Sequence, residues 1–294
     1  MSWITFSLLA AFGWAIVNII DKYLMSGLDV KPVVPIVASG IIGLFMGGVI
    51  YWTIGFSYLS LLNILLAIVA GGLFMGMAYF YFKAVQIEEI SRVAPLFYLS
   101  PLFIAIIAGF FLGEMFTPIK YIGITLLAAG AIMISVKGKL SLKLGRAFWF
   151  MMVSALLISV EQVIVKHLLN QADFWTIFSW MRIGSFLTLI PFVPIGLTAL
   201  KDAYRKSGPK IYGLIVCSEG LTLAGVLSAT VAASIGFITL VNALSSIQPF
   251  FVLLFSIFLS IHRPQVLREE IGGSTIALKI TSIILMFAGA IIIS

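Results

Sequence analysis

The sequence predicts an all-α integral membrane protein with ten transmembrane helices in two inverted repeats of five. Composition is the first observation: 62% of the 294 residues are hydrophobic and only 10% are charged, whereas about 25% are charged in a typical soluble domain. The second is a succession of apolar segments long enough to cross a bilayer. The third is a repeated ending, since residues 129–135 read AGAIMIS and residues 288–294 read AGAIIIS.

Ten apolar segments result from dividing the chain at its charged, proline-rich and glycine-rich points. A membrane-spanning helix needs ~20 mostly apolar residues, and these runs are too long and continuous for the alternating strands of a membrane barrel. The longest stretches left over, residues 197–210 and 261–274, are too short for a soluble domain, so we expect the function within the helical bundle. The predicted spans are residues 3–24, 33–54, 61–82, 91–112, 118–136, 147–169, 174–196, 211–233, 238–260 and 275–293.

Basic residues gather in alternate loops. Fifteen of the eighteen Lys and Arg residues lie in or beside the loops that follow the first, third, fifth, seventh and ninth spans. Lys120 and Lys166 lie at the other face, and Arg182 lies inside a span. The positive-inside rule places the basic loops in the cytoplasm and both termini outside, in a multi-pass plasma or inner membrane protein. The net charge of +7 is therefore interpreted as an orientation signal, and no nucleic-acid partner is predicted.

Two charged groups near the basic loops are interpreted as solvated turns. Charged residues are mostly exposed in folded proteins, so no role in transport is assigned to either group. The groups are Glu88, Glu89 and Arg92, and the run Arg268–Glu270.

An internal repeat is indicated by three pairs of residues in the same order in both halves. They are Lys22 with Lys166, Pro101 with Pro249, and Lys120 with Lys279. The first repeat is assigned to residues 1–140 and the second to residues 141–294. Because each repeat holds five spans, the two run in opposite directions through the bilayer, and a pseudo-two-fold axis is expected in the membrane plane.

One stretch of the first half resembles a known family of carriers. The segment Ile90–Leu96, followed by Pro101–Phe103 and Gly113–Glu114, together with the glycine-rich fifth and tenth spans, resembles the EamA-like proteins of the drug/metabolite transporter superfamily. The Gly-Glu turn has no counterpart in the second half, where Ile261 and His262 stand.

This resemblance implies a carrier that exports or exchanges small metabolites such as amino acids, sugars, nucleotide sugars or lipid-linked head groups. Members of the family are usually drawn with cytoplasmic termini. The loop charges indicate the reverse orientation, and we follow the charges because the bias between the two faces is large.

Three ionisable residues lie inside predicted spans, namely Glu161, Arg182 and Glu219. A charge at the centre of a span costs ~2.5–3.5 kcal/mol on insertion scales, so each is a candidate for substrate binding. At a rise of about 1.5 Å per residue, Glu161 and Arg182 fall at nearly the same depth, and the long arginine side chain could lean toward either Glu161 or Glu219. In one interpretation Arg182 binds an anionic substrate or alternates between the two carboxylates, and a carboxylate released from it carries a coupling proton. In the other interpretation they form a fixed, neutralised ion pair.

Further polar residues and prolines inside the spans are also candidates. The polar side chains could bind substrate or could hydrogen-bond one helix to another. The prolines remove backbone hydrogen bonds, so they mark either the broken helices of a transport site or simple packing kinks. The polar candidates are Asn18, Gln162, Tyr79, Tyr98, Asn242 and Gln248, and the helix-breaking candidates are Pro95, Pro101 and Pro249.

Enzyme chemistry has little support in the sequence. The chain has two histidines, no metal-binding spacing, no phosphate-binding loop and no nucleophile beside a base, so neither an enzyme nor a cofactor or metal site is predicted. The sequence instead predicts a secondary transporter of a small polar metabolite, with anionic metabolites among the candidates, working by alternating access in the lipid bilayer. A translocator of a lipid-linked head group is the alternative, and an integral membrane enzyme ranks below it.

Overall fold

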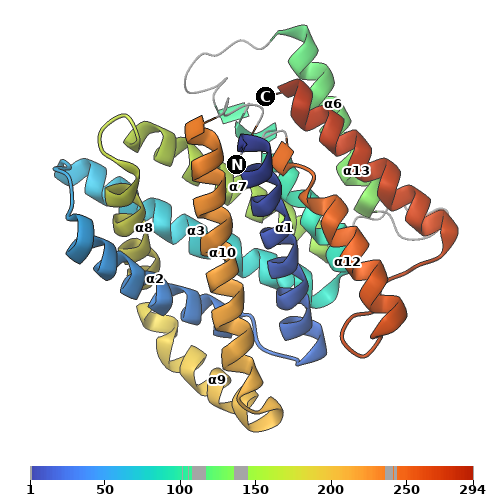
Figure 1. The fold of residues 1–294 in the computed structure, drawn as a ribbon, viewed down its shortest axis with the longest axis horizontal. Helices are drawn as coiled ribbons and strands as arrows, with labels where there is room; N and C mark the ends of the chain where they lie inside the picture. Colours follow the sequence, from blue (N-terminus) through green and yellow to red (C-terminus); the bar gives the residue numbers. More distant parts are fainter. Residues whose placement is uncertain are drawn as a thin grey trace.

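The computed structural model describes residues 2–100, 102–104, 106–107, 117–135, 145–235, 241 and 244–293. All regular secondary structure in these residues is helical (Figure 1), which confirms the predicted all-α class. Two of the predicted site residues, Pro101 and Asn242, lie outside the described residues. The elements are α1 (Trp3–Lys22), η1 (Tyr23–Gly27), α2 (Val33–Ile54), α3 (Leu61–Ile87), α4 (Ile90–Val93), η2 (Ala94–Leu99), α6 (Pro118–Ser135), α7 (Arg146–Leu168), α8 (Phe174–Leu189), η3 (Ile190–Phe192), α9 (Val193–Ser207), α10 (Lys210–Ile235), α12 (Gln248–His262) and α13 (Gly273–Ile293).

Eight helices of the described chain are long and apolar enough to cross a membrane. Segment α4–η2 and helix α12 are apolar but shorter, and they fall in the fourth and ninth predicted spans. The eight long helices are Trp3–Gly27, Val33–Ile54, Leu61–Ile87, Pro118–Ser135, Arg146–Leu168, Phe174–Ser207, Lys210–Ala232 and Gly273–Ile292.

The boundaries of several helices have local causes. The Ser60 hydroxyl accepts a hydrogen bond from the backbone N–H of Asn63 at the start of α3, and such caps satisfy N–H groups that lack a partner within the helix. Gly55 follows α2 at a φ of 79° and Gly208 follows α9 at a φ of 72°. Only glycine adopts these left-handed angles without strain, so both residues end their helices.

The seventh span is longer than predicted, because residues expected in a loop after position 196 continue the helix as α9 to Ser207. Its charged residues Lys201, Arg205 and Lys206 are exposed, while Gly196, Ala199 and Ala203 are buried on the other side. This two-sided pattern is typical of an amphipathic helix. The charges that suggested a loop are therefore the exposed face of α9.

Neighbouring helices pair across the two halves of the chain. Helix α1 packs along α10, α3 packs along α7 and α8, α2 packs along α8, and α6 packs along α13. Close approach depends on glycine at the crossing of α3 and α8, where Ser185 Oγ donates a hydrogen bond to the carbonyl of Gly71 at 3.0 Å. A Cβ at Gly71 would overlap backbone atoms of Met181 and Ser185.

We expect Gly71→Ala to lower the free energy of unfolding by about 1–3 kcal/mol, because overpacked helices must move apart. The measurement is a thermal melt of the detergent-purified protein. Gly48→Ala is the matched control, since a Cβ at Gly48 meets open space, and we expect it to be neutral or slightly stabilising. Equal melting temperatures for the two variants would contradict this account of the crossing.

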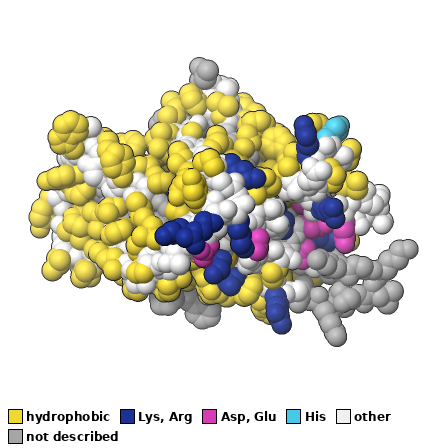
Figure 2. Space-filling view, turned by 90° about the horizontal axis from the view of Figure 1, so that it is seen from below, with side chains coloured by type: hydrophobic (Ala, Val, Ile, Leu, Met, Phe, Trp, Pro, Cys, Tyr) yellow, Lys and Arg dark blue, Asp and Glu magenta, His cyan; other side chains and the backbone are white. Residues whose placement is uncertain are grey.

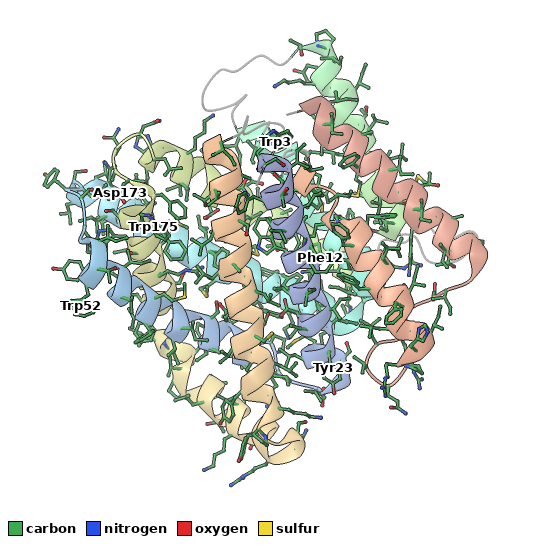
Figure 3. The ribbon with its side chains drawn as sticks, in the orientation of Figure 1. Trp3, Phe12, Tyr23, Trp52, Asp173 and Trp175 are labelled. Atoms are coloured by element: carbon green, nitrogen blue, oxygen red, sulfur yellow. The ribbon has the colours of Figure 1, made fainter. Side chains whose placement is uncertain are left out.

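One end of the bundle is rich in basic side chains. Lysine and arginine gather on the face where α1 and α9 end, which Figure 2 shows from below the view of Figure 1. We call this end of the bundle the basic face and the other end the opposite face. In Figure 3, Trp3 and Asp173 lie toward the opposite face, whereas Tyr23 lies toward the basic face.

Glu89, Arg92 and Glu269 of the predicted solvated turns instead form a buried ion-pair cluster with Lys279 at the basic face, so the interpretation is wrong for these three residues. Arg268 and Glu270 are exposed, as expected. Lys279 Nζ of α13 lies 2.8 Å from both Glu89 Oε2 and Glu269 Oε2. Arg92 Nε lies 2.9 Å from Glu89 Oε2, and Arg92 Nη2 lies 3.1 Å from Glu270 Oε2. The side chains of Lys279 and Glu269 are each 1% exposed. Opposite charges neutralise one another here, which is the condition under which charged groups tolerate burial.

Candidate functional site

A cavity of about 510 Å³ lies between the two halves of the chain. Its walls come mainly from α1, α2, α3, α7, α8 and α10. The lining runs from Leu24 and Pro35, near the basic face, to Val165 and Phe174, near the opposite face. Most of the lining is apolar, and its polar and charged residues are Asn18, Asp21, Ser39, Tyr81, Glu161, Arg182, Ser185, Ser218, Glu219, Thr222 and Gln248.

Arg182 reaches the cavity from α8. Its guanidinium carbon lies 4.7 Å from the ring centroid of Phe178 and 5.4 Å from that of Phe74, so both rings stabilise the positive charge. Gly43 leaves room for the arginine stem, because a Cβ there would lie 2.8 Å from Arg182 Cδ. Among the described residues, the guanidinium has no direct ion pair and no hydrogen bond. Its N–H donors are therefore available to a ligand.

Glu161 of α7 and Glu219 of α10 line the same cavity. Glu161 is 7% exposed, and Glu219 faces Ser39 of α2. Both carboxyls interact electrostatically with Arg182, but neither forms a direct ion pair with it in the described structure. The structure thus brings the three charged residues to one cavity without the fixed ion pair that the sequence left open.

Asp21, which the sequence analysis did not single out, lies near the basic-face end of the cavity. Its Oδ2 accepts a hydrogen bond from Tyr81 Oη at 3.0 Å, and its Oδ1 accepts one from Ser218 Oγ at 3.1 Å. Asn18 Nδ2 donates to Tyr81 Oη at 2.9 Å. These four residues come from α1, α3 and α10, so the network joins both halves at the cavity wall.

The same network continues to α12 and η2 through two of the predicted polar residues. Gln248 Nε2 donates to Asn18 Oδ1 at 3.0 Å, and Tyr98 Oη lies 3.2 Å from Gln248 Oε1. Tyr98 Oη also lies 3.0 Å from the backbone carbonyl of Ser245. Asn18, Tyr98 and Gln248 are thus linked to each other, and Asn18 and Gln248 line the cavity as well.

Two predicted residues lie away from this cavity. Gln162 is exposed on α7, because one residue beyond Glu161 turns a side chain by about 100° around the helix. Tyr79 is 43% exposed and has Lys83 Nζ 5.6 Å from its ring centroid, whereas Ala78 and Tyr81 of the same helix line the cavity. The structure therefore does not place Gln162 opposite Asn18.

The predicted helix-breaking prolines lie at irregular points of the short helices. Pro95 is buried in η2, a 3₁₀ segment that directly follows α4. Pro249 is buried in the first turn of α12, where a missing N–H costs little because that group has no partner within the helix. Neither proline lines the cavity, and both occur where the fourth and ninth spans depart from a single long helix.

Asp173 caps α8 beside the opposite-face end of the cavity. Its Oδ1 accepts hydrogen bonds from the backbone N–H groups of Trp175 and Thr176, and its Oδ2 accepts one from Ser57 Oγ at 2.6 Å. The hydrogen bond from Ser57, with those from Thr176 and Trp175, outweighs partial burial and lowers the pKa of Asp173 to about 2 from its ordinary value of 3.8. The cap holds Phe174, a cavity-lining residue, at the start of the helix.

We expect Asp173→Ala to lower the free energy of unfolding by about 0.5–2 kcal/mol at neutral pH through loss of this cap. A group with a lowered folded-state pKa stabilises the fold above its ordinary pKa and loses that effect as the pH falls toward the folded value. The difference from the parent protein in thermal melts should therefore shrink between about pH 4 and pH 2. Asp173→Asn is the control, because asparagine also caps helices. A gap between parent and Asp173→Ala that is the same at pH 7 and pH 3 would contradict this account.

Comparisons with known proteins agree with a transporter fold. Residues 1–136 match the model of the EamA-like transporter family. A segment of 56 residues is 39% identical to an uncharacterized transporter in the cobO 3' region of a Sinorhizobium species. That segment spans 19% of this chain and 40% of the relative.

A protein of known crystal structure shares the fold over nearly the whole chain. The TM-score is 0.54 at 16% sequence identity, and the match covers 99% of this chain and 95% of the other. At this identity the likeness shows the fold alone. The resemblance to the EamA-like transporter family that the sequence indicates is thus confirmed by the match over residues 1–136.

Proposed function

We propose that this chain is a secondary transporter that carries a small polar metabolite across a cell membrane by alternating access. The observation that supports this most is the Arg182 guanidinium, which faces a cavity between the two halves and has no hydrogen bond or direct ion pair with another described residue. Arg182 is half-buried in the cavity, and a charged donor shielded from bulk water binds an anionic or carbonyl group of a substrate strongly. Substrates with an anionic group are therefore the first candidates.

The packing of the helices supports two inverted repeats. Two-fold symmetry can be checked by replacing each helix of a contacting pair with its counterpart in the other repeat. The pair α1–α10 then becomes α7–α3, and the pair α1–α12 becomes α7–η2. All four pairs are in contact. The pairs α2–α8 and α6–α13 become themselves, and both are also in contact. Exchange of this kind is expected of repeats related by a two-fold axis, and such repeats rock around a central site in many carriers.

The roles of the charged residues follow from their positions. Arg182 would bind the negative charge of the substrate, and Glu161 and Glu219 would hold the arginine by their charge when the cavity is empty. Asn18 and Gln248 would add hydrogen bonds near the basic-face end of the cavity. A carboxylate displaced from Arg182 by substrate would be free to take up a coupling proton.

Ligand binding is the direct test. A panel of metabolites with and without an anionic group is screened by thermal shift on the purified protein, and each hit is repeated with Arg182→Gln, which removes the charge. We expect anionic metabolites to stabilise the parent protein and to lose most of that effect in the variant. Hits of neutral compounds that stabilise both proteins equally would contradict the assignment of substrate charge to Arg182.

A further inference from the structure

At the basic-face end of the cavity, a lysine at the end of α1 binds the end of α3. Lys22 Nζ donates hydrogen bonds to the backbone carbonyls of Val85 at 2.7 Å and Glu88 at 2.6 Å. These carbonyls lie at the end of α3, where a positive charge is favoured by the helix dipole and by acceptors without helical partners. Leu24 and Met25, which follow Lys22, are buried. The ends of α1 and α3 are therefore held together at this face.

A second link joins the same two helices just inside the cavity. Asp21 of α1 accepts a hydrogen bond from Tyr81 of α3, one turn before the carbonyl that Lys22 binds. Asp21 and Tyr81 both line the cavity. A substrate that reaches this end of the cavity thus meets side chains that adjoin the Lys22 contact.

The repeat-related lysine at the opposite face has no such contact among the described residues. Lys166 of α7 is the counterpart of Lys22, and α10, of 26 residues, is the counterpart of α3, of 27. Lys166 is exposed and forms no hydrogen bond or ion pair in the described part of the chain. Whereas α1 and η1 pack against α3, no comparable contact of α7 with α10 occurs among the described residues. The cavity lining reaches Val165, next to Lys166, at the opposite-face end.

We propose that Lys22 and Lys166 are reciprocal gate residues that close the cavity at the basic and opposite faces in turn. In the structure Lys22 binds the carbonyls that end α3, and we assign this arrangement to the state closed at the basic face. In the other state Lys22 releases these carbonyls, and Lys166 binds those at the end of α10. The exchange is expected of inverted repeats, because each repeat can adopt the conformation that its counterpart has in the other state. This inference rests on the proposed alternating-access transporter.

The test measures access to the cavity from each side of the membrane. Cys217, the only cysteine of the sequence, is replaced by serine, and Ala78→Cys places a reporter on the cavity wall. An impermeant maleimide is then applied to either face of sealed vesicles. We expect the parent reporter to react from the opposite face, and Lys22→Met to raise the rate of labelling from the basic face about tenfold or more, since hydrogen bonds to a charged group are lost. Lys22→Arg keeps the charge and donors, and we expect it to restore the parent rate.

Lys166→Met is the matched variant, because it removes the counterpart lysine without touching the closed gate. We expect it to leave basic-face labelling at the parent rate but to slow substrate exchange across proteoliposomes about tenfold, by weakening the other state. The reciprocal gate is overturned if folded Lys22→Met is labelled from the basic face at the parent rate, or if Lys166→Met exchanges substrate at the parent rate. If Lys22→Met does not fold, Lys22→Gln takes its place with the same criterion. Labelling needs no substrate, so it tests the gate independently of transport. If the parent protein exchanges no metabolite but Lys22→Met is labelled faster from the basic face, the proposed function is refuted and the gate role of Lys22 is supported.

Discussion

Arg182→Ala is expected to reduce substrate transport by roughly 100-fold or more while the protein remains folded. An arginine fork that binds an anionic group makes two charge-assisted hydrogen bonds, each contributing about 1.5–3 kcal/mol. Loss of both corresponds to at least two decades in binding. The thermal melt should change less than transport, because Arg182 forms no direct ion pair or hydrogen bond with the described residues. It interacts with them through the rings of Phe74 and Phe178 and through the charges of Glu161 and Glu219.

Two variants make this prediction specific. Arg182→Lys keeps the charge but loses the planar fork, so we expect an intermediate rate of transport. Arg205→Ala removes an exposed arginine of α9, and its rate should equal that of the parent protein. The measurement is uptake of a labelled substrate into proteoliposomes, with a melt of each variant as the folding control. Parent-like uptake by folded Arg182→Ala would remove the arginine from the mechanism.

Lys279→Met is expected to be the most destabilising single change considered, lowering the free energy of unfolding by about 3–5 kcal/mol. The substitution leaves the carboxyls of Glu89 and Glu269 without the ammonium that lies 2.8 Å from each. Burial already raises the pKa of Glu269 in spite of Lys279. For Glu89, burial alone would raise the pKa, but the hydrogen bond and charge of Lys279, with hydrogen bonds from the Glu270 N–H and Arg92, hold it below 4.5. Both carboxyls would therefore be harder to ionise in the variant.

The pH dependence separates this mechanism from a simple packing defect. A carboxyl with a raised folded-state pKa favours folding below its ordinary pKa and opposes folding as the pH rises through the folded value. The deficit of Lys279→Met should thus be largest at neutral pH and shrink as the pH falls toward about 4. Adding Glu269→Gln should restore part of the melting temperature. Lys201→Met, at an exposed lysine of α9, should melt like the parent, and a deficit of Lys279→Met that is independent of pH would contradict the account.

The helical fold was predictable because the bilayer imposes length and polarity on each span. Helix α2 begins at Val33 and ends at Ile54, as the apolar run predicts. Segment length alone could not show that the helix after Pro194 continues to Ser207, because its charges are spread over one exposed face. Burial on one side of a helix depends on the neighbour, here α2, that covers it.

The candidate site was predictable only where a residue violates the polarity of its span. Glu161, Arg182 and Glu219 stand out because a charge inside a span is costly, and all three line the cavity. Asp21 escaped notice because it lies beside Lys22 near the predicted end of a span, where ionisable residues are ordinary. Gln162 lies away from the cavity because the match between repeats predicts how far along its helix a residue lies, but not which side of the helix faces the cavity.

The buried ion-pair cluster shows a different limit. Ser91 hydrogen-bonds Glu269 across 178 positions of sequence, and Arg92 pairs with Glu270 across the same separation. Local patterns contain no information on such partners, so residues of this kind appear as exposed loop charges in the sequence. A single sequence cannot distinguish them from solvated turns.

Counterflow is the most direct measurement of the proposed transporter. Proteoliposomes are loaded with an excess of an unlabelled metabolite identified by thermal shift, and a trace of the same labelled compound is added outside. A carrier that alternates access to one cavity predicts a transient accumulation of label inside above its outside concentration, which is lost in Arg182→Ala. Label that equilibrates without this overshoot, or an overshoot that survives Arg182→Ala unchanged, would contradict the account.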